Sequence, residues 1–577
     1  MLRFVLCRVA LILALFGAVL PVLFAQTKLV EGEQKFFETI DVRVMNVDAV
    51  VTGKDGKPVT GLSKDDFEVF ENGVKQEITN FLEIRGTTAP SPASATQTAA
   101  APAVSEPEFR RRLIAVFIDN VALEPFHRNA ILPPLQRFLQ ANMRAGDQAM
   151  IAVWGSSLKL ELPMTSDHAA VEAALTRLVS QTTRGTQNAA EKDQFRKALA
   201  DLISVYGSLR PPEKPPYMSG LGEARSYAMR RDHELRQKEA ALKSVIAALR
   251  GIEGRKICVL VTEKFSSNPS DDVFAYLDSI KSSFAGGDNA SPMVDAREFE
   301  RNSLVGEIGD AANGSGVTLY AIDGSGKETD EIDRSASVKV QVSSRSAPTT
   351  LTAGLTLRGV AAATGGAALS GSSNWQIAFD TIANDLNSYY SLGYRATSKR
   401  RDRTKAIQVR LRSKKYSVRT RQAVVEKSIV TEMNDAVGAN LFYPVAKNDL
   451  KIEVTTGDPG SVVEGSMVVP VTVRIPTEAL ALLPEGSDLT GSFSVFAGFL
   501  RNDGAVSKID RQVKQFRFPA ESLKRRKEIT VKLEVAADAR TDAISIGVMD
   551  EQSHATGFAA VKVAAPPAAT PPVPPTK

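Results

Sequence analysis

Side chains able to do chemistry are few in this chain of 577 residues, and they lie far apart in the sequence. The four histidines have none of the spacings that bind a metal; they are His127, His168, His233 and His554. Two Gly-Ser-Gly tripeptides, residues 314–316 and 324–326, match neither a nucleophile elbow nor a phosphate-binding loop. We expect both to be turns. The sequence therefore predicts no catalytic residues and no nucleotide or redox cofactor.

One acidic residue stands where open α/β sheets bind ligands. Asp119 follows the apolar run of residues 113–118, which suits a central strand buried on both faces. The acid then lies at the carboxyl end of that strand, the edge where such sheets bind ligands. Three further apolar runs, residues 149–154, 256–261 and 317–322, are separated by helix-like segments. Strands that alternate with helices predict a doubly wound α/β sheet.

Short motifs around these runs resemble a von Willebrand factor A (vWA) domain. Besides Asp119, the resemblance is carried by Arg144-Ala145-Gly146-Asp147, Leu162-Pro163-Met164-Thr165-Ser166-Asp167, Gly254-Arg255-Lys256, Thr262-Glu263, Ala363-Thr364-Gly365-Gly366 and Tyr389-Tyr390-Ser391-Leu392-Gly393-Tyr394. The last motif, with the basic segment after it, is similar to the VWFA-related proteins abundant in acidobacteria. The resemblance covers residues 38–422 and implies a vWA/Rossmann-like central domain.

The resemblance also implies a metal-ion-dependent adhesion site (MIDAS) at the top of the sheet, made of Asp-x-Ser-x-Ser, a Thr and an Asp. Asp119, Thr186 and Glu263 match the first acid, the Thr and the last acid, whereas Val121 and Leu123 replace the two serines and offer no oxygen. Magnesium requires octahedral oxygen ligands. We therefore expect a degenerate site with at most weakly bound magnesium and no other cofactor. Val121 and Leu123 would instead give this edge a hydrophobic contact with a partner.

The amino terminus is typical of a secretory signal peptide, predicted over residues 1–25. Arg3 and Arg8 flank the start of an apolar run, and Ala25 is a small residue at the cleavage point. The run is short for a membrane span of ~20 residues, which argues against the alternative of an uncleaved anchor. We expect an exported protein that is periplasmic, on the outer surface or secreted.

Composition limits the other possibilities. A formal net charge of +5 gives no indication of nucleic-acid binding. Of the two cysteines, Cys7 leaves with the signal peptide, so the mature chain has no internal disulfide. Cys258 falls within an apolar run and is expected to be a buried small hydrophobe. The domains must therefore be held together by their cores.

Alternation, turn signals and composition divide the rest of the chain. We predict a small β domain (38–86), a Pro/Ala/Thr/Ser-rich linker (87–108), the vWA-like domain (110–395, with 389–394 as its last strand), a basic β-hairpin (396–425), a β-sandwich domain (436–563) and a Pro-rich tail (564–577). Seven short alternating segments within the sandwich domain indicate an immunoglobulin-like fold. They are residues 450–454, 467–475, 493–499, 513–518, 528–535, 543–549 and 557–563.

Two parts of the vWA-like domain depart from a simple pattern. Pro133-Pro134 is expected to break the helix that follows Asp119. Residues 187–250 form a helical excursion longer than the simplest version of the fold needs. Its charged residues are typical of solvated helix faces.

Three functions fit these observations. The first is an exported, non-catalytic module that binds a protein or cell-surface ligand at the top of the vWA-like sheet. The second is a structural component of the cell envelope, and the third is an enzyme whose chemistry lies in residues 187–250. Separately, the basic residues 395–421 suit an anionic envelope component such as lipopolysaccharide, an acidic glycan or a phospholipid. Few aromatic residues interleave with these charges, so no nucleic acid is expected as a partner.

Overall fold

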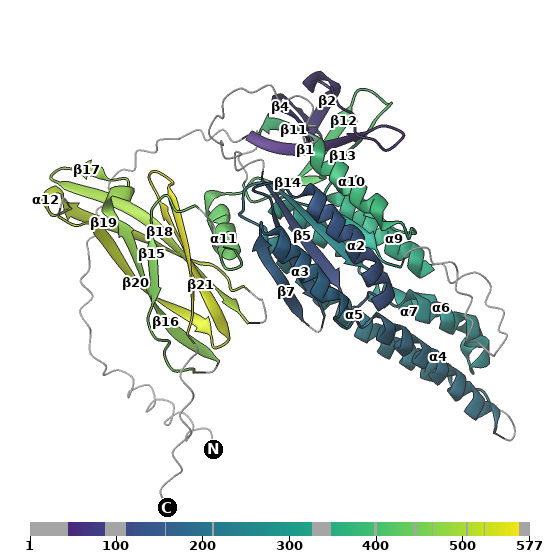
Figure 1. Cartoon of the computed structure of the whole chain (residues 1–577). Coiled ribbons are helices and arrows are strands. Elements are labelled where there is room, and N and C mark those ends of the chain that lie inside the picture. The colour runs from purple at the N-terminus through teal and green to yellow at the C-terminus, as the bar shows by residue number, and fades with distance from the viewer. Residues whose placement is uncertain are drawn as a thin grey trace, which may run out of the picture. The chain divides into compact units, whose positions relative to one another are not determined.

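The computed structural model describes residues 44–86, 111–155, 157–209, 213–325, 348–396, 401–443, 447–463, 465–502, 506–523 and 525–564. The predicted signal peptide and linker, and the predicted tail beyond residue 564, lie outside the described residues. The described part is a mixed α/β structure with one six-stranded sheet that is mainly parallel and several antiparallel sheets (Figure 1).

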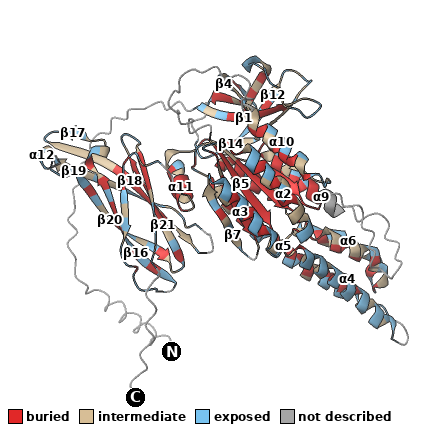
Figure 2. Ribbon diagram, viewed as in Figure 1, coloured by how far each residue is buried: buried red, intermediate tan, exposed pale blue. Residues whose placement is uncertain are grey.

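The six-stranded sheet has the order β10-β9-β8-β5-β6-β7. Its strands are β5 (Arg112–Asp119), β6 (Gln148–Trp154), β7 (Leu158–Thr165), β8 (Arg255–Thr262), β9 (Val317–Asp323) and β10 (Ala368–Leu369). All neighbours are parallel except β7, which pairs antiparallel with β6 on one edge. The four apolar runs of the sequence form β5, β6, β8 and β9, which confirms these strands. Every residue of β5 is buried, as expected of a central strand (Figure 2).

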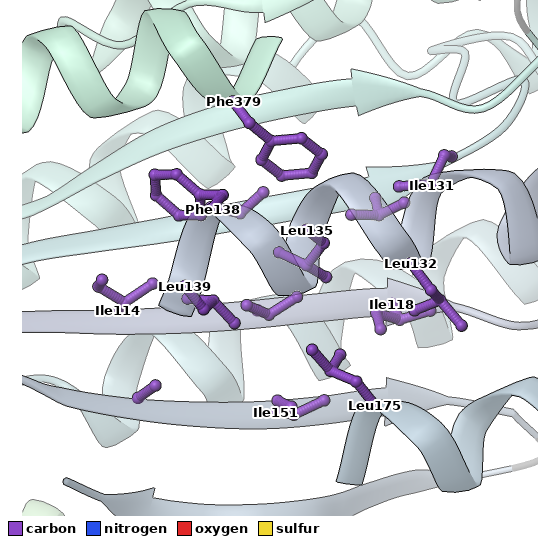
Figure 3. Close-up of a cluster of buried hydrophobic side chains, with 14 of the residues drawn as sticks. Ile114, Ile118, Ile131, Leu132, Leu135, Phe138, Leu139, Ile151, Leu175 and Phe379 are labelled. Carbon is purple, nitrogen blue, oxygen red and sulfur yellow. The ribbon is translucent and has the colours of Figure 1, made fainter. Parts of the chain in front are cut away.

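Helices cover both faces of this sheet. Alternate residues of β5 point to opposite faces and therefore pack against different helices. Ile114, Val116 and Ile118 pack in one hydrophobic cluster with α2 (Pro125–Asn142), α3 (His168–Val179) and α10 (Trp375–Asn387) (Figure 3). Leu113, Ala115 and Phe117 pack in a second cluster with α5 (Tyr217–Ala248), α8 (Leu304–Ser315) and α9 (Pro348–Ala363). The doubly wound arrangement is therefore present.

Helix α2 is continuous through Pro133 and Pro134, so the predicted break is wrong. A proline inside a helix removes one backbone hydrogen bond and costs about 3 kcal/mol or more. Ile131, Leu135 and Phe138 face the sheet on both sides of the two prolines (Figure 3). Burial of that apolar stripe holds the helix together in spite of the cost.

The helical excursion is partly a core element. It contains α4 (Gly185–Gly207) and α5, and the carboxyl-terminal half of α5 packs on the sheet through residues such as Leu242 and Ile246. The amino-terminal half of α5 packs instead with α4 and α6 (Asp271–Ile280) in a separate cluster. The short α7 (Pro292–Ala296) follows α6. Much of α4 is exposed (Figure 2).

A small β unit combines strands that precede the six-stranded sheet in the sequence with strands that follow it. One sheet has the order β13-β1-β11-β4 and the other β14-β12-β2-β3. The strands are β1 (Val44–Thr52), β2 (Phe67–Glu71), β3 (Val74–Gln76), β4 (Ile78–Arg85), β11 (Ser388–Arg395), β12 (Thr404–Leu411), β13 (Ser417–Thr420) and β14 (Ala423–Val425). Asn72-Gly73 forms the turn between β2 and β3, with both residues at positive φ.

Two expectations about this unit are wrong. Strand β11 pairs with β1 and β4, so it does not belong to the six-stranded sheet, of which we expected it to be the last strand. The basic segment is not a simple two-stranded hairpin: β13 pairs with β1 and not with β12, while β12 pairs with β2 and, within the segment, antiparallel with the short β14. Buried residues of β1, β2, β11 and β12 share one hydrophobic cluster, so these segments fold together.

The carboxyl-terminal part contains two antiparallel sheets, β15-β16-β20 and β17-β18-β21-β22, with β19 paired to β18. Its elements are α11 (Ile429–Asn440), β15 (Glu453–Thr456), β16 (Ser466–Pro476), β17 (Leu483–Glu485), β18 (Asp488–Arg501), β19 (Asp510–Pro519), α12 (Ala520–Leu523), β20 (Glu528–Asp538), β21 (Thr541–Asp550) and β22 (Thr556–Lys562). Residues of both sheets share one hydrophobic cluster, so the sheets pack face to face. Each of the seven predicted segments overlaps one of these strands, although residues 436–440 belong to α11.

Among the helices that the structure describes, none is both long and apolar enough to cross a membrane.

Candidate functional site

The side chain of Asp119 is completely buried at the carboxyl end of β5. Its Oδ1 accepts hydrogen bonds from the backbone N–H groups of Val121 and Ala122, both at 3.1 Å. Its Oδ2 accepts a hydrogen bond from Thr262 Oγ1 at 2.6 Å and lies 2.6 Å from Lys238 Nζ. Both carboxylate oxygens are therefore committed to partners within the chain. We call Asp119, Lys238 and Thr262 the Asp119 site.

Lys238 comes from α5, and its side chain is only 10% exposed. Its ammonium group also lies 5.6 Å from the centre of the Phe265 ring, a cation–π distance. Our prediction that the charged residues of the excursion form solvated faces is wrong for this residue, and also for Arg231 and Glu239, which are buried. A signal was present in the sequence. Lys238 lies three residues after Leu235 and four before Leu242, within the stripe that packs on the sheet.

Glu263 follows Thr262 directly and is likewise buried, with its side chain 2% exposed. Its Oε1 lies 2.9 Å from His127 Nδ1 and accepts a hydrogen bond from the backbone N–H of Glu124 at 3.2 Å. Burial raises the pKa of Glu263 to about 7, although the nearby His127 opposes this shift. The structure thus brings Glu263 to the same edge as Asp119 but gives it a partner of its own. We call residues 119–127 and 262–265 the rim.

This raised pKa predicts how the stability of the α/β unit depends on pH. A carboxyl group with a higher pKa in the folded than in the unfolded state stabilises the fold below its unfolded value of 4.5, and the contribution is lost as the pH rises through about 7. Replacement of Glu263 by Gln imitates the protonated form. At about pH 8 we expect Glu263→Gln to exceed the wild type in free energy of unfolding by up to about 3 kcal/mol, and at about pH 4 to match it.

The measurement is urea unfolding followed by tryptophan fluorescence at several pH values. The two tryptophans of the chain, Trp154 and Trp375, both pack in the α/β unit, so their signal reports on that unit. A wild type and a Glu263→Gln variant with the same pH dependence would contradict the prediction.

The remaining residues expected at this site lie differently. Val121 and Leu123 are 4% and 0% exposed and belong to the two hydrophobic clusters, so they offer no contact to a partner, contrary to our expectation. Thr186 is exposed in the first turn of α4, and the described structure contains no hydrogen bond from its side chain. The start of α4 does approach the Asp119 loop. Asn188 Nδ2 donates to Val121 O at 2.6 Å, and a Cβ at Gly185 would come within 2.4 Å of Leu123 O.

This arrangement can be compared with what a divalent metal needs. Magnesium requires about six oxygen ligands near octahedral positions. Asp119 is bound by four donors, Glu263 is bound by His127 and a backbone N–H, and the two serine positions hold buried hydrocarbon side chains. Within the described ranges, no three His, Cys, Asp or Glu side chains are grouped so that they could hold a metal. As folded, these residues do not fit a divalent ion.

The charged residues buried in the excursion are paired with one another or with neighbouring segments. Arg231 contacts Glu191 and Glu234, both at 2.6 Å. Glu239 contacts Arg301 at 2.6 Å and also Lys243. Such pairs are typical of structural networks rather than of groups poised for catalysis.

No family model matches the chain, and no curated protein matches it. Solved structures with some similarity include an aerotolerance-related membrane protein from Bacteroides fragilis, with 12% identity, a TM-score of 0.22, and coverage of 48% of this chain and 98% of that one. A pilus adhesin from Lactobacillus rhamnosus GG shows 9% identity and a TM-score of 0.25, with 89% and 61% covered. Three domains of a type V pilus tip protein from Porphyromonas gingivalis show 9% and 0.23, with 91% and 77% covered. With TM-scores this low, these similarities establish neither the fold nor the function of the chain.

Proposed function

We propose that this chain is an exported, non-catalytic interaction module whose vWA-like α/β unit binds a protein or cell-surface ligand through the rim. The observation that carries the proposal is Phe126. This residue lies in the first turn of α2, directly after the Asp119 loop, and its side chain is 78% exposed. It is the most exposed large hydrophobic side chain among the described residues. Exposed aromatic side chains are the residue type that most often anchors a protein interface.

The surroundings of Phe126 support a binding surface rather than a reaction centre. His127 lies beside it, with ring centres 5.7 Å apart, and its side chain is 25% exposed. Asp119 and Glu263, which stand at the carboxyl ends of β5 and β8, have their carboxyl groups bound to partners inside the protein. The rim therefore presents an aromatic ring and an imidazole edge to a partner, while the carboxyl groups of Asp119 and Glu263 are internal. We propose that this edge is a degenerate MIDAS, in which the acids serve the fold and the partner is bound without a metal.

The test is quantitative capture of partners from a bacterial envelope extract by the immobilised mature chain. Replacement of Phe126 by Ser removes the exposed ring, and we expect it to reduce capture by about tenfold or more, as for a hot-spot residue. Val513→Ser is the matched control, because Val513 is 51% exposed on β19 of the β-sandwich; it should leave capture unchanged. Capture should persist in a metal chelator. Equal capture by the Phe126 variant and the wild type, or capture abolished by the chelator, would overturn the proposal.

A second kind of partner is favoured by the basic segment. Among the described residues of 395–421, seven cationic side chains are exposed: Arg395, Arg401, Arg403, Arg410, Arg412, Lys414 and Lys415. Lys405 does not belong to this surface, because it is buried. We propose that an anionic envelope component can bind here through charge, so this part of the capture should decrease steeply with salt while the part due to Phe126 persists.

The alternatives make different predictions for the same material. A structural envelope component should assemble with itself, so the mature chain alone would form higher oligomers. An enzyme that uses the excursion would need a reactive group there, and the paired charges of Arg231 and Glu239 give no support for one.

A further inference from the structure

We propose that the ammonium group of Lys238 is the resident cation of the Asp119 site, in the place that the vWA resemblance gives to a divalent metal ion. The helical excursion then has a specific role, because α5 delivers this charge to the end of β5. The proposal concerns what balances Asp119, and it holds or fails independently of whether the rim binds a partner.

The first step is the charge of Asp119. Its side chain is 0% exposed, and a buried carboxylate is very costly unless a counter-charge and hydrogen bonds stabilise it. Two backbone N–H groups and the Thr262 hydroxyl supply hydrogen bonds but no net charge. Lys238 Nζ, 2.6 Å from Oδ2, is the cation that the structure pairs with this carboxylate. The pair is therefore neutral without any ion from solution.

The second step is how firmly the ammonium is held. Lys238 lies one turn from Leu235 and one turn from Leu242, and both leucines pack in the hydrophobic cluster that also contains Phe117 and Val121. Its aliphatic stem is thus fixed against the same face of the sheet that carries Asp119. Phe265 covers the ammonium from the rim with the face of its ring. The lysine cannot leave without exposing this cluster or burying an unpaired charge.

The third step is competition. A magnesium ion binds a carboxylate oxygen at about 2.1 Å. Oδ2 is already bound by the ammonium of Lys238 and the hydroxyl of Thr262. A magnesium ion bound to the same oxygen would be repelled by the positive charge of the ammonium. Glu263 supplies no compensating charge, because its carboxyl group interacts with His127. Lys238 therefore excludes a divalent ion, and its removal should open a latent site for one.

The test is manganese binding by the mature chain, measured by calorimetry and by electron paramagnetic resonance of free manganese. We expect the wild type to bind none at the Asp119 site. Lys238→Ala removes the ammonium and leaves room for an ion with its waters, so its affinity for manganese should rise by at least about tenfold. Manganese should also raise the thermal unfolding temperature of Lys238→Ala and not that of the wild type.

Two controls separate this effect from general damage. Lys243→Ala removes a half-buried lysine from the same helix, one that pairs with Glu239 and Glu307, and it should not gain manganese binding. Asp119→Asn combined with Lys238→Ala should lose any gained binding. A folded Lys238→Ala variant that gains none would overturn the proposal. If Lys238→Ala does not fold, manganese titrations of the wild type and of Asp119→Asn are compared instead. Manganese binding by the wild type that is lost in Asp119→Asn would overturn the proposal, whereas identical titrations of the two proteins would support it.

Discussion

Replacement of Asp119 by Asn is expected to lower the free energy of unfolding of the α/β unit by about 3–5 kcal/mol, because it leaves the buried Lys238 without a counter-charge. The asparagine has nearly the same shape, so no cavity forms. Its amide nitrogen would also face donors in either orientation: the Thr262 hydroxyl and the ammonium at the position of Oδ2, or two backbone N–H groups at the position of Oδ1. The loss should appear in urea unfolding monitored by tryptophan fluorescence, since Trp154 and Trp375 both report on this unit.

The decisive variant is Asp119→Asn combined with Lys238→Met. A buried ion pair replaced by uncharged side chains of similar size is often nearly neutral in stability. We therefore expect the double variant to recover most of the loss of either single variant, and the coupling energy of the cycle to be about 2 kcal/mol or more. Asp538→Asn is the control, because Asp538 pairs with Arg540 on the surface of the β-sandwich, and it should leave this fluorescence transition unchanged. Additive losses in the double variant would show that the two residues do not interact as the structure indicates.

The sequence predicted the position of Asp119 but not its partner, and the reason is physical. A buried strand is recognisable from a local apolar run, and its carboxyl end follows from the chain direction. A salt bridge between residues more than a hundred positions apart in the sequence depends on how α5 packs on the sheet. No local sequence pattern predicts that packing. The spacing of Leu235, Lys238 and Leu242 did place the lysine within the apolar stripe. We interpreted it as solvated because charged residues on long helices usually are.

Strand partners were harder to predict than strands. Strands β1 and β4 lie within the predicted β domain and β11 coincides with a predicted strand, yet a strand pattern does not identify the neighbouring strand. The vWA resemblance placed β11 in the large sheet, whereas its backbone hydrogen bonds go to β1 and β4. The apolar residues Val121 and Leu123 present a similar limit. Their types excluded metal ligands, but only the packing of α2 and α5 shows that both point inward.

The small β unit contains a second buried lysine, and it gives the other large expected effect. Lys405 of β12 is 2% exposed; its Nζ lies 2.7 Å from Glu426 Oε2 and 3.3 Å from Glu71 Oε1. Tyr394 of β11 donates its hydroxyl hydrogen to Glu71 Oε2 at 2.8 Å. The network therefore joins a strand near the start of the chain to three segments more than three hundred residues later.

Replacement of Lys405 by Met keeps the length of the side chain but leaves two buried carboxylates with no cation between them. We expect the small β unit to lose about 3–5 kcal/mol of stability, the usual result of removing one partner from a buried charge network. The tryptophans do not lie in this unit, so amide hydrogen exchange of β1 and β11, read by mass spectrometry, is the suitable measurement. Exchange in both strands should accelerate together, because they pair and share one hydrophobic cluster.

The matched control for this network is Lys414→Met, which changes an exposed lysine of the same basic segment and should alter stability by less than about 0.5 kcal/mol. Glu71→Gln and Glu426→Gln added to Lys405→Met should recover much of the protection, since the buried charges are then all removed. If Lys405→Met left exchange in β1 and β11 unchanged, the ion pairs would not hold the unit together, and its hydrophobic cluster alone would have to explain why segments so distant in sequence fold as one.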